Sequence, residues 1–188
     1  MPRRTFPDLR LVTDRLTLRP FDSGDISAVA RACADDLTQR WLPLPRPYDE
    51  AVAEQWCTAE AELARVNGDG VQLAMADRDT NLLVGGVCLK RTSWPRGITE
   101  IGYWTSPDSR GRGFATEAAA ALGRWALAID AIHRVELTAA TGNLASQRVA
   151  EKAGYRFEGV ARAGGYVHGG RVDLRIYSLI RADITDYP

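Results

Sequence analysis

The feature of this sequence that most constrains its fold is a basic, glycine-containing turn between a predicted strand and a predicted helix. An extended run over Thr99–Thr105 leads through Ser106–Ser109 into Arg110–Thr116, which reads RGRGFAT. Such a turn brings main-chain N–H groups together at a helix N-terminus, where the helix dipole favours an anion. The two glycines let a phosphate approach the backbone, and the two arginines add cationic donors. The sequence therefore predicts a phosphate-bearing ligand on residues 110–116.

Two better-known phosphate loops do not fit this turn. The nucleotide-triphosphate loop ends in Gly-Lys-Ser/Thr, which is absent here, and the dinucleotide fingerprint needs three glycines at G-x-G-x-x-G spacing. Gly111 and Gly113 are instead followed by Phe114 and Ala115. Taken alone, the turn fits equally well with an exposed basic segment that only starts a helix.

Composition narrows the class of protein. A length of 188 residues suits one domain, so we expect a single domain over residues 1–188. Lys plus Arg and Asp plus Glu number 24 each, so no overall charge favours nucleic acid or a membrane surface as partner. No apolar run reaches the ~20 residues of a membrane span, and residues 1–10 lack the apolar core of a signal peptide. We therefore expect a cytoplasmic protein.

The three cysteines, Cys33, Cys57 and Cys88, show neither metal-ligand spacing nor a disulfide framework. Cys33 and Cys57 fall on apolar helical faces, which indicates buried thiols. We therefore expect no bound metal.

Strand and helix patterns intermix along the chain, without an internal repeat. Strands are predicted over residues 9–21, 71–76, 82–90, 99–105, 134–140, 155–163 and 171–180. Helices are predicted to start at Asp22–Asp25 and to cover residues 49–67, 113–129 and 143–154, with loops over 40–47 and 164–170. This mixture predicts an α+β fold with a mixed, mostly antiparallel central sheet flanked by helices.

Four segments, in order, resemble the GNAT superfamily of N-acetyltransferases. Arg110–Ala115 has the Arg-x-x-Gly-x-Ala pattern of its acyl-CoA pyrophosphate loop, and Asn143–Tyr155 resembles its second signature, Asn-x-x-Ser followed by Lys-x-Gly-Phe/Tyr. Thr13–Phe21 and Val172–Leu179 resemble the first and last strands of the branch related to ribosomal-protein N-terminal (RimJ/RimL-type) acetyltransferases. The resemblance covers nearly the whole chain and implies a single GNAT-like domain with splayed central strands.

The resemblance implies that acetyl-CoA is a co-substrate and that its acetyl group passes directly to a primary amine in a ternary complex. Main-chain N–H of Tyr103 or Trp104 is then expected to stabilise the oxyanion. The implied cofactor contacts are Tyr103, Trp104, Thr105, Arg110, Gly111, Arg112, Gly113, Ala115, Thr116 and Asn143.

Two residues are the first candidates for catalysis. By resemblance, Ser146 donates a proton to the leaving thiolate, although a first-turn serine also helps to cap a helix. Many relatives use a tyrosine as this acid, and we find no clear equivalent. Glu100, on the central strand, is the first candidate for general base, because a relative uses a glutamate on this strand. Glu158, Asp173 and His168 rank behind it, and a base acting through water or an already deprotonated amine is an alternative.

The acceptor is a protein N-terminal amine or a small amine. Trp41, Trp94 and Tyr166 are candidates to line its site, and packing explains each equally well. Some members of the branch carry a glutamate before the tyrosine that resembles Tyr166, but this chain has Gly165.

Gly102 is consistent with a β-bulge or with close packing. The branch often forms homodimers. A longer donor such as succinyl-CoA, or a non-catalytic acyl-CoA-binding module, are the alternatives.

Overall fold

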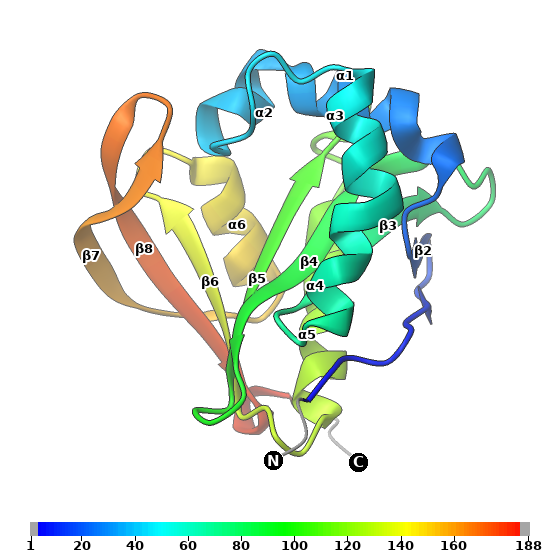
Figure 1. Cartoon of the computed structure of the whole chain (residues 1–188). Helices are drawn as coiled ribbons and strands as arrows, with labels where there is room; N and C mark the ends of the chain where they lie inside the picture. Colours follow the sequence, from blue (N-terminus) through cyan, green and yellow to red (C-terminus); the bar gives the residue numbers. More distant parts are fainter. Residues whose placement is uncertain (1–3, 185–188) are drawn as a thin grey trace.

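A computed structural model describes residues 4–184 of the chain as one curved sheet with helices on both faces (Figure 1). The strands are β1 (Leu11–Val12), β2 (Leu16–Arg19), β3 (Val71–Asp77), β4 (Leu83–Ser93), β5 (Ile98–Thr105), β6 (Arg134–Ala140), β7 (Arg156–Val167) and β8 (Gly170–Ile180). The α-helices are α1 (Ile26–Ala34), α2 (Asp36–Trp41), α3 (Glu50–Gln55), α4 (Ala61–Val66), α5 (Phe114–Ala128) and α6 (Leu144–Lys152). A π-helical turn over Trp56–Glu60 joins α3 to α4, and short 3-10 turns cover Ser23–Asp25, Pro107–Ser109 and Arg181–Asp183. No helix within residues 4–184 is long and apolar enough to span a membrane.

The sheet has the strand order β1-β2-β3-β4-β5-β6-β8-β7. Only β5 and β6 are parallel; the other neighbouring strands pair antiparallel. This arrangement confirms the predicted α+β class and the mixed, mostly antiparallel sheet.

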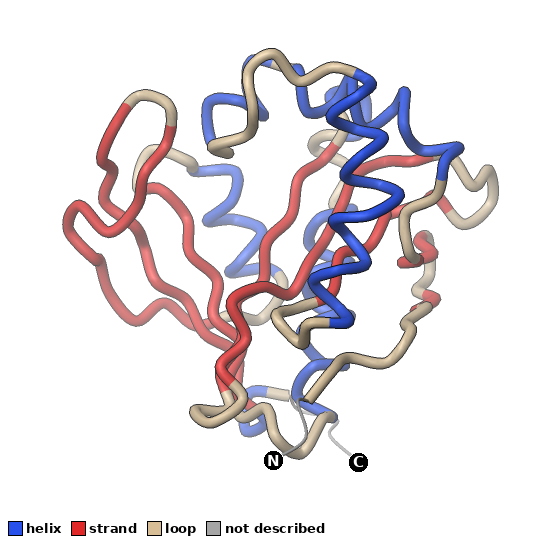
Figure 2. The backbone as a smooth tube through the Cα atoms, viewed as in Figure 1, coloured by secondary structure: helices blue, strands red, loops and turns tan. Residues whose placement is uncertain are grey.

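The two parallel strands diverge, as the resemblance implied. β5 pairs with β6 only from Ile98 with Arg134 to Ile101 with Leu137. Beyond that point β5 stays paired with β4 as far as Thr105, and β6 stays paired with β8 as far as Ala140. Figures 1 and 2 show the resulting V between the two strands, with α6 behind it.

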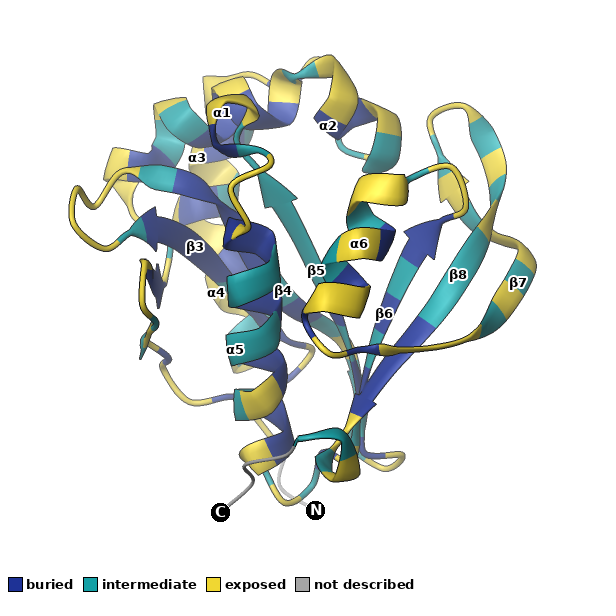
Figure 3. Ribbon diagram, turned by 180° about the vertical axis from the view of Figure 1, so that it is seen from behind, coloured by how far each residue is buried: buried dark blue, intermediate teal, exposed yellow. Residues whose placement is uncertain are grey.

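The core lies mainly between the sheet and α5, as Figure 3 shows from behind. Ala118, Ala119, Leu122 and Ala126 of this helix are fully buried against Leu89, Ile101, Val135 and Leu137 of the strands. The small alanines let α5 lie close to the sheet, as their spacing predicts. A second, smaller cluster beneath α1 and α3 contains Cys33 and Cys57, which are buried as expected. Burial raises the pKa of the Cys33 thiol to about 12.

The strand predicted over residues 9–21 is wrong in its length. The chain turns at Thr13–Arg15, where the main-chain N–H of Thr13 donates to the oxygen of Leu16 at 2.9 Å, and two short strands result. Thr13 and Arg15 of this turn bind Glu117 in the first turn of α5.

Two loop predictions are also corrected. The loop expected over residues 40–47 begins later, because α2 continues to Trp41 before the prolines from Pro43 onward prevent further helix. The loop expected over residues 164–170 is mostly strand, because a register shift between Ala161 and Gly165 absorbs the irregular residues. Only the tight turn at His168–Gly169 joins β7 to β8.

Gly102 does not form a bulge against β4. It pairs in regular register with Cys88, and a Cβ atom at Gly102 would lie 3.2 Å from the Cys88 sulfur and 3.3 Å from Lys90. Close packing on this face of the sheet therefore accounts for the glycine.

Candidate functional site

The open half of β5 presents an unpaired main-chain edge. From Gly102 to Thr105 the strand has β4 on one side, and β6 no longer pairs with it on the other. Exposed strand edges of this kind offer N–H and C=O groups to an extended ligand. Tyr103, Trp104 and Thr105, all predicted to contact the cofactor, lie on this edge.

The Arg110–Thr116 turn follows this edge directly. Gly111 and Gly113 adopt φ values of +75° and +84°, which glycine tolerates and most side chains do not. No main-chain N–H from Gly111 to Thr116 donates a hydrogen bond to another group within residues 4–184. Gly113 starts α5 without a side-chain cap. The N-terminus of α5 thus leaves these amides unbonded within residues 4–184.

A polar network holds this loop in place. Arg15 forms an ion pair with Glu117 at 2.7 Å and donates to the main-chain oxygen of Arg112 at 2.9 Å. Thr13 donates its hydroxyl to Glu117 at 2.6 Å. Burial opposes the charged form of Glu117, but these bonds outweigh it and leave the pKa of its carboxyl below the usual range. We did not assign Arg15 or Glu117 from the sequence, although three polar residues interrupting an apolar strand were a usable signal.

The two loop arginines have different surroundings. Arg110 forms an ion pair with Asp35 and donates to the hydroxyl of Thr38 at 2.9 Å. Arg112 lies over the ring of Phe114, 4.7 Å from its centroid, and forms no ion pair with the residues that the structure describes. Arg112 is therefore the more accessible cation for an anion on the loop.

The start of α6 faces the open edge of β5. Asn143 caps the helix, since its side-chain oxygen accepts from the N–H of Ser146 at 3.1 Å. The hydroxyl of Tyr103 lies 2.8 Å from the hydroxyl of Ser146 and 3.1 Å from its main-chain oxygen. Burial raises the pKa of Tyr103 to about 12, so this hydroxyl is protonated at neutral pH. No local pattern predicts this contact between Tyr103 and Ser146.

Glu100 lies where β5 and β6 begin to diverge. It forms ion pairs with Arg91 and with Lys90, the latter at 3.3 Å, and it accepts from the hydroxyl of Thr138 at 3.3 Å. Its side chain is 11% exposed. By strand alternation it lies on the face of β5 opposite to Tyr103, the residue that contacts Ser146.

The other candidate bases are held by contacts elsewhere. Glu158 accepts from Arg134 and from Ser178, each at 2.7 Å, and these bonds lower its pKa to about 2. Asp173 accepts from the main-chain N–H of Ala163 at 2.7 Å. His168, at the tip of the β7–β8 hairpin, lies 2.9 Å from the main-chain oxygen of Leu44.

Of the three aromatic candidates for the acceptor site, Trp94 is explained by packing. Its ring lies against Phe6, with the centroids 4.8 Å apart, and its indole N–H donates to the main-chain oxygen of Gly68 at 2.8 Å.

The other two aromatic candidates differ in position. Trp41 ends α2, and a Cβ atom placed on Gly142 would lie 3.3 Å from its ring. The ring therefore covers the loop just before α6. Tyr166 lies on β7 near the hairpin tip and is 63% exposed. The hairpin reaches the loop after α2 through the contact between His168 and Leu44, which brings both aromatics to the same end of the molecule.

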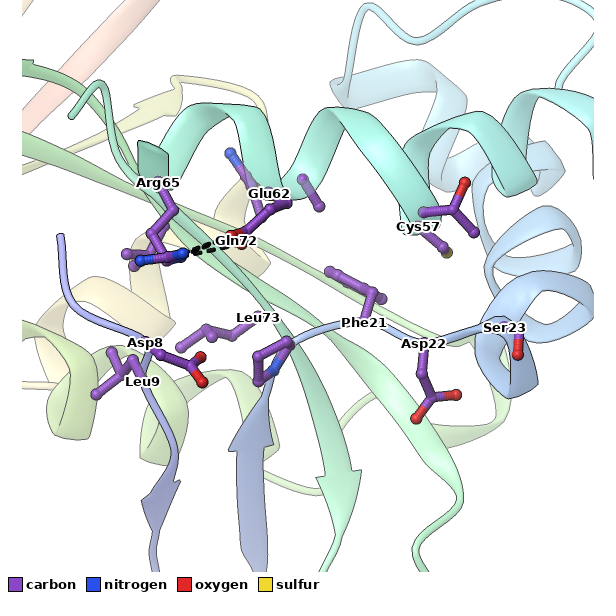
Figure 4. A pocket seen from close by; sticks show the side chains of 14 residues that line it. Asp8, Leu9, Phe21, Asp22, Ser23, Cys57, Glu62, Arg65, Gln72 and Leu73 are labelled. Carbon is purple, nitrogen blue, oxygen red and sulfur yellow. Dashed lines mark hydrogen bonds and ion pairs between the residues drawn. The ribbon is translucent and has the colours of Figure 1, made fainter. Parts of the chain in front are cut away.

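A cavity of about 480 Å³ lies elsewhere, between α4 and the strands β2 and β3. Figure 4 shows its lining, which includes Asp8, Phe21, Cys57 and Gln72 and the ion pair of Arg65 with Glu62. It contains none of the predicted site residues. The cavity is therefore separate from the loop and from the V between β5 and β6.

Comparisons with known proteins agree with this geometry. Residues 15–156 match the family described as Acetyltransferase (GNAT) domain. The chain is 28% identical to "Putative ribosomal N-acetyltransferase YdaF" of Bacillus subtilis (strain 168) over 180 residues, covering 92% of this chain and 94% of that protein. A Vibrio cholerae structure described as a "putative ribosomal-protein-serine acetyltransferase" has a TM-score of 0.80 at 24% identity, covering 93% of this chain and 99% of its own. Mycobacterium smegmatis RimJ, solved with a CoA-disulfide, has a TM-score of 0.82 at 21% identity, covering 91% and 84%.

Proposed function

The chain is an N-acetyltransferase of the GNAT family, and we propose that it transfers the acetyl group of acetyl-CoA to the α-amine of a protein N-terminus. The observation that carries this proposal is the row of unbonded main-chain N–H groups over Gly111–Thr116, next to the open edge of β5. The names of relatives that act on ribosomal proteins support a protein acceptor.

In the proposed complex, the diphosphate of coenzyme A binds the amides of Gly111, Arg112, Gly113, Ala115 and Thr116. Hydrogen bonds from main-chain N–H to a charged phosphate oxygen are strong, and the dipole of the fifteen-residue helix α5 favours the negative charge. Arg112 adds a cation at the same place. Binding of the diphosphate fixes one end of the cofactor. The thioester at the other end is thereby placed in the V between β5 and β6.

The extended arm of the cofactor then lies along β5 as an additional strand. It would use the edge from Gly102 to Thr105 that β6 leaves unpaired. A main-chain N–H at Tyr103 or Trp104 would donate to the thioester oxygen and stabilise the charge that develops there. Asn143, which caps α6, would lie beside the arm.

In the proposed reaction the amine attacks the thioester carbon, and the bond to sulfur breaks. Ser146 donates its hydroxyl proton to the departing thiolate and regains a proton from solvent when coenzyme A leaves. Tyr103 holds that hydroxyl at 2.8 Å and, because burial raises its pKa to about 12, remains a neutral hydrogen-bond partner. A fixed donor next to the sulfur lowers the barrier by avoiding the reorganisation that solvent would need.

Removal of the proton from the amine is assigned to Glu100. The carboxylate of Glu100 forms ion pairs with Arg91 and Lys90 in this structure. The assignment therefore requires that the acceptor displaces one of these cations, or that a water molecule connects the carboxylate to the amine. Glu100→Gln tests this assignment. If Glu100 is the base, the variant has a much lower kcat with an unchanged Kd for coenzyme A; an unchanged kcat would point to a base that acts through water.

The experiment that tests the function is a turnover screen with acetyl-CoA, read by release of free coenzyme A thiol. The acceptors are tetrapeptides with N-terminal serine or alanine, matched peptides with a blocked N-terminus and a set of small primary amines. We expect turnover with free N-terminal peptides and none with blocked ones. Turnover confined to small amines would contradict the protein acceptor, and a parallel series with succinyl-CoA tests the donor.

A further inference from the structure

The side chain of Arg110 is bound by two residues outside the loop. Its guanidinium forms an ion pair with Asp35 and donates to the hydroxyl of Thr38 at 2.9 Å. Thr38 is 7% exposed, and the side chains of Arg110 and Asp35 are 31% and 24% exposed. This contact, which we call the Arg110 bridge, joins the cofactor loop to the start of α2.

Asp35 also caps the N-terminus of α2. Its carboxylate caps α2 by accepting from the main-chain N–H of Thr38 at 3.0 Å. The guanidinium of Arg110 holds the pKa of Asp35 below its usual range, so the charge persists on mild acidification. One carboxylate thus fixes both the helix and the arginine.

The far end of α2 reaches the acceptor side of the site. Trp41, its last residue, lies over Gly142, directly before the Asn143 that caps α6. Figure 3 shows α2 above the ends of β5 and α6. The helix is held as a unit, because the buried side chain of Gln39 donates to the main-chain oxygen of Cys33 at 2.8 Å and accepts from Arg46 at 2.8 Å. A short, rigid helix therefore connects Arg110 to Trp41.

We propose that Arg110 is a positioning residue that links the cofactor loop to α2 and so sets how well Trp41 receives the acceptor, rather than a ligand of the cofactor phosphates. The proposal rests on the proposed function, because it takes the V between β5 and β6 as the place of reaction. Main-chain amides and Arg112 hold the diphosphate, while Arg110 stays with Asp35. The bridge thereby makes acceptor binding depend on the arrangement of the cofactor loop.

A double-mutant cycle with Arg110→Gln and Asp35→Asn tests the bridge. Asparagine is as good a helix cap as aspartate, so Asp35→Asn removes the charge and keeps the cap. Arg112→Gln is the matched control, because it removes the other loop arginine and leaves the bridge intact. Arg110→Lys is the conservative variant, which keeps a cation facing Asp35.

Three quantities are measured for each variant: the Kd for coenzyme A by calorimetry, kcat and KM for a tetrapeptide with N-terminal serine, and hydrogen exchange of residues 36–47. We expect each bridge variant to lower kcat/KM for the peptide roughly tenfold, mainly through KM, and the double variant to be no worse than either, as coupled neighbours behave. The Kd for coenzyme A should stay within about threefold of the parent, while Arg112→Gln should raise it by more. Arg110→Lys should recover most of the loss.

Two results would overturn the proposal. One is a Kd for coenzyme A that rises tenfold or more in Arg110→Gln and stays unchanged in Asp35→Asn, which would make Arg110 a phosphate ligand. The other is a double variant whose loss is the product of the two single losses. Hydrogen exchange needs no substrate, so faster exchange over residues 36–47 in both single variants decides the structural link even if the peptide is not acetylated. Absence of coenzyme A binding in the parent chain would count against the proposed function instead.

Discussion

The two helices that follow β5 and β6 in the chain begin in opposite ways. α6 starts at Asn143, whose side chain closes the first turn by accepting from Ser146 at 3.1 Å. α5 starts at Gly113, which has no side chain, and its first amides have no partner within residues 4–184. A helix N-terminus that the chain caps itself can orient a side chain, whereas one that is left open can bind an anion. The first holds the proposed acid, and the second holds the proposed cofactor phosphates.

The largest expected effect comes from a bulky side chain at Gly113, which would block the uncapped N-terminus of α5. Gly113→Leu should weaken coenzyme A binding by more than about 100-fold, since losing two hydrogen bonds to a charged group amounts to about 3 kcal/mol or more. Calorimetry measures the affinity. Gly154→Leu is the control, because Gly154 has φ +89° against +84° at Gly113 and so suffers the same backbone strain away from the loop. Retained affinity in Gly113→Leu would mean that the phosphates bind elsewhere.

The capped end should affect chemistry and not cofactor binding. Ser146→Ala is expected to lower kcat about 100-fold, within the range for loss of an acid catalyst. The Kd for coenzyme A should change less than threefold. Ser27→Ala, an exposed serine on α1, serves as the control and should have the parent rate. An unchanged kcat in Ser146→Ala would remove Ser146 from the mechanism.

The partner of Ser146 should have a smaller effect. Tyr103→Phe keeps the ring and removes the hydroxyl that lies 2.8 Å from Ser146, and kcat should fall about tenfold as the donor loses its fixed position. Burial raises the pKa of Tyr103 to about 12, so the loss should be the same factor from about pH 6 to pH 10. A loss that grows with pH would show that the hydroxyl ionises within this range.

The cap itself can be removed without touching the reacting groups. Asn143→Ala should lower the free energy of unfolding by about 1 kcal/mol, as for other N-cap replacements. Asn143→Asp keeps a capping oxygen and should recover most of the stability. Thermal or urea unfolding measures the difference. If Asn143→Ala is neutral, the contrast between the two helix ends does not extend to their stability.

The smallest effect concerns the network beside the open end. Hydrogen bonds from Thr13 and Arg15 outweigh burial and keep the pKa of Glu117 below its usual range. A lowered carboxylate pKa contributes stability above the pKa of the unfolded chain, about 4.5, and this contribution disappears as the pH falls through the folded pKa. Glu117→Gln should therefore lower the free energy of unfolding by about 1 kcal/mol or less at pH 7.

The difference from the parent should shrink below about pH 4.5. Unfolding curves at several pH values measure it, with the exposed Glu54→Gln as control. A difference that stays constant down to pH 2 would show that Glu117 acts through shape and not through charge.

Sequence reasoning reached most of the fold and the open helix end because both depend on short local patterns. Apolar spacing located the strands and helices, and Gly111 with Gly113 located the turn with positive φ. It missed the break at Thr13–Arg15 because the partner of Thr13, Glu117, lies 104 residues away. It missed the strand character of residues 164–167 because their glycines resemble a loop, although residues 165–167 pair with residues 170–172 in a hairpin. It also missed the contact of Tyr103 with Ser146, which lie 43 residues apart.

Local sequence is enough to predict that a strand leads into a glycine turn and a helix, since the conformations of Gly111 and Gly113 and the apolar spacing of residues 114–128 depend on neighbouring residues. Which of the two arginines remains accessible depends on tertiary contacts, because both lie in the same basic turn. Folding placed Asp35, 75 residues away, beside Arg110 and left Arg112 over Phe114. A side chain's partner depends on which distant segment packs beside it, and no local pattern contains that information.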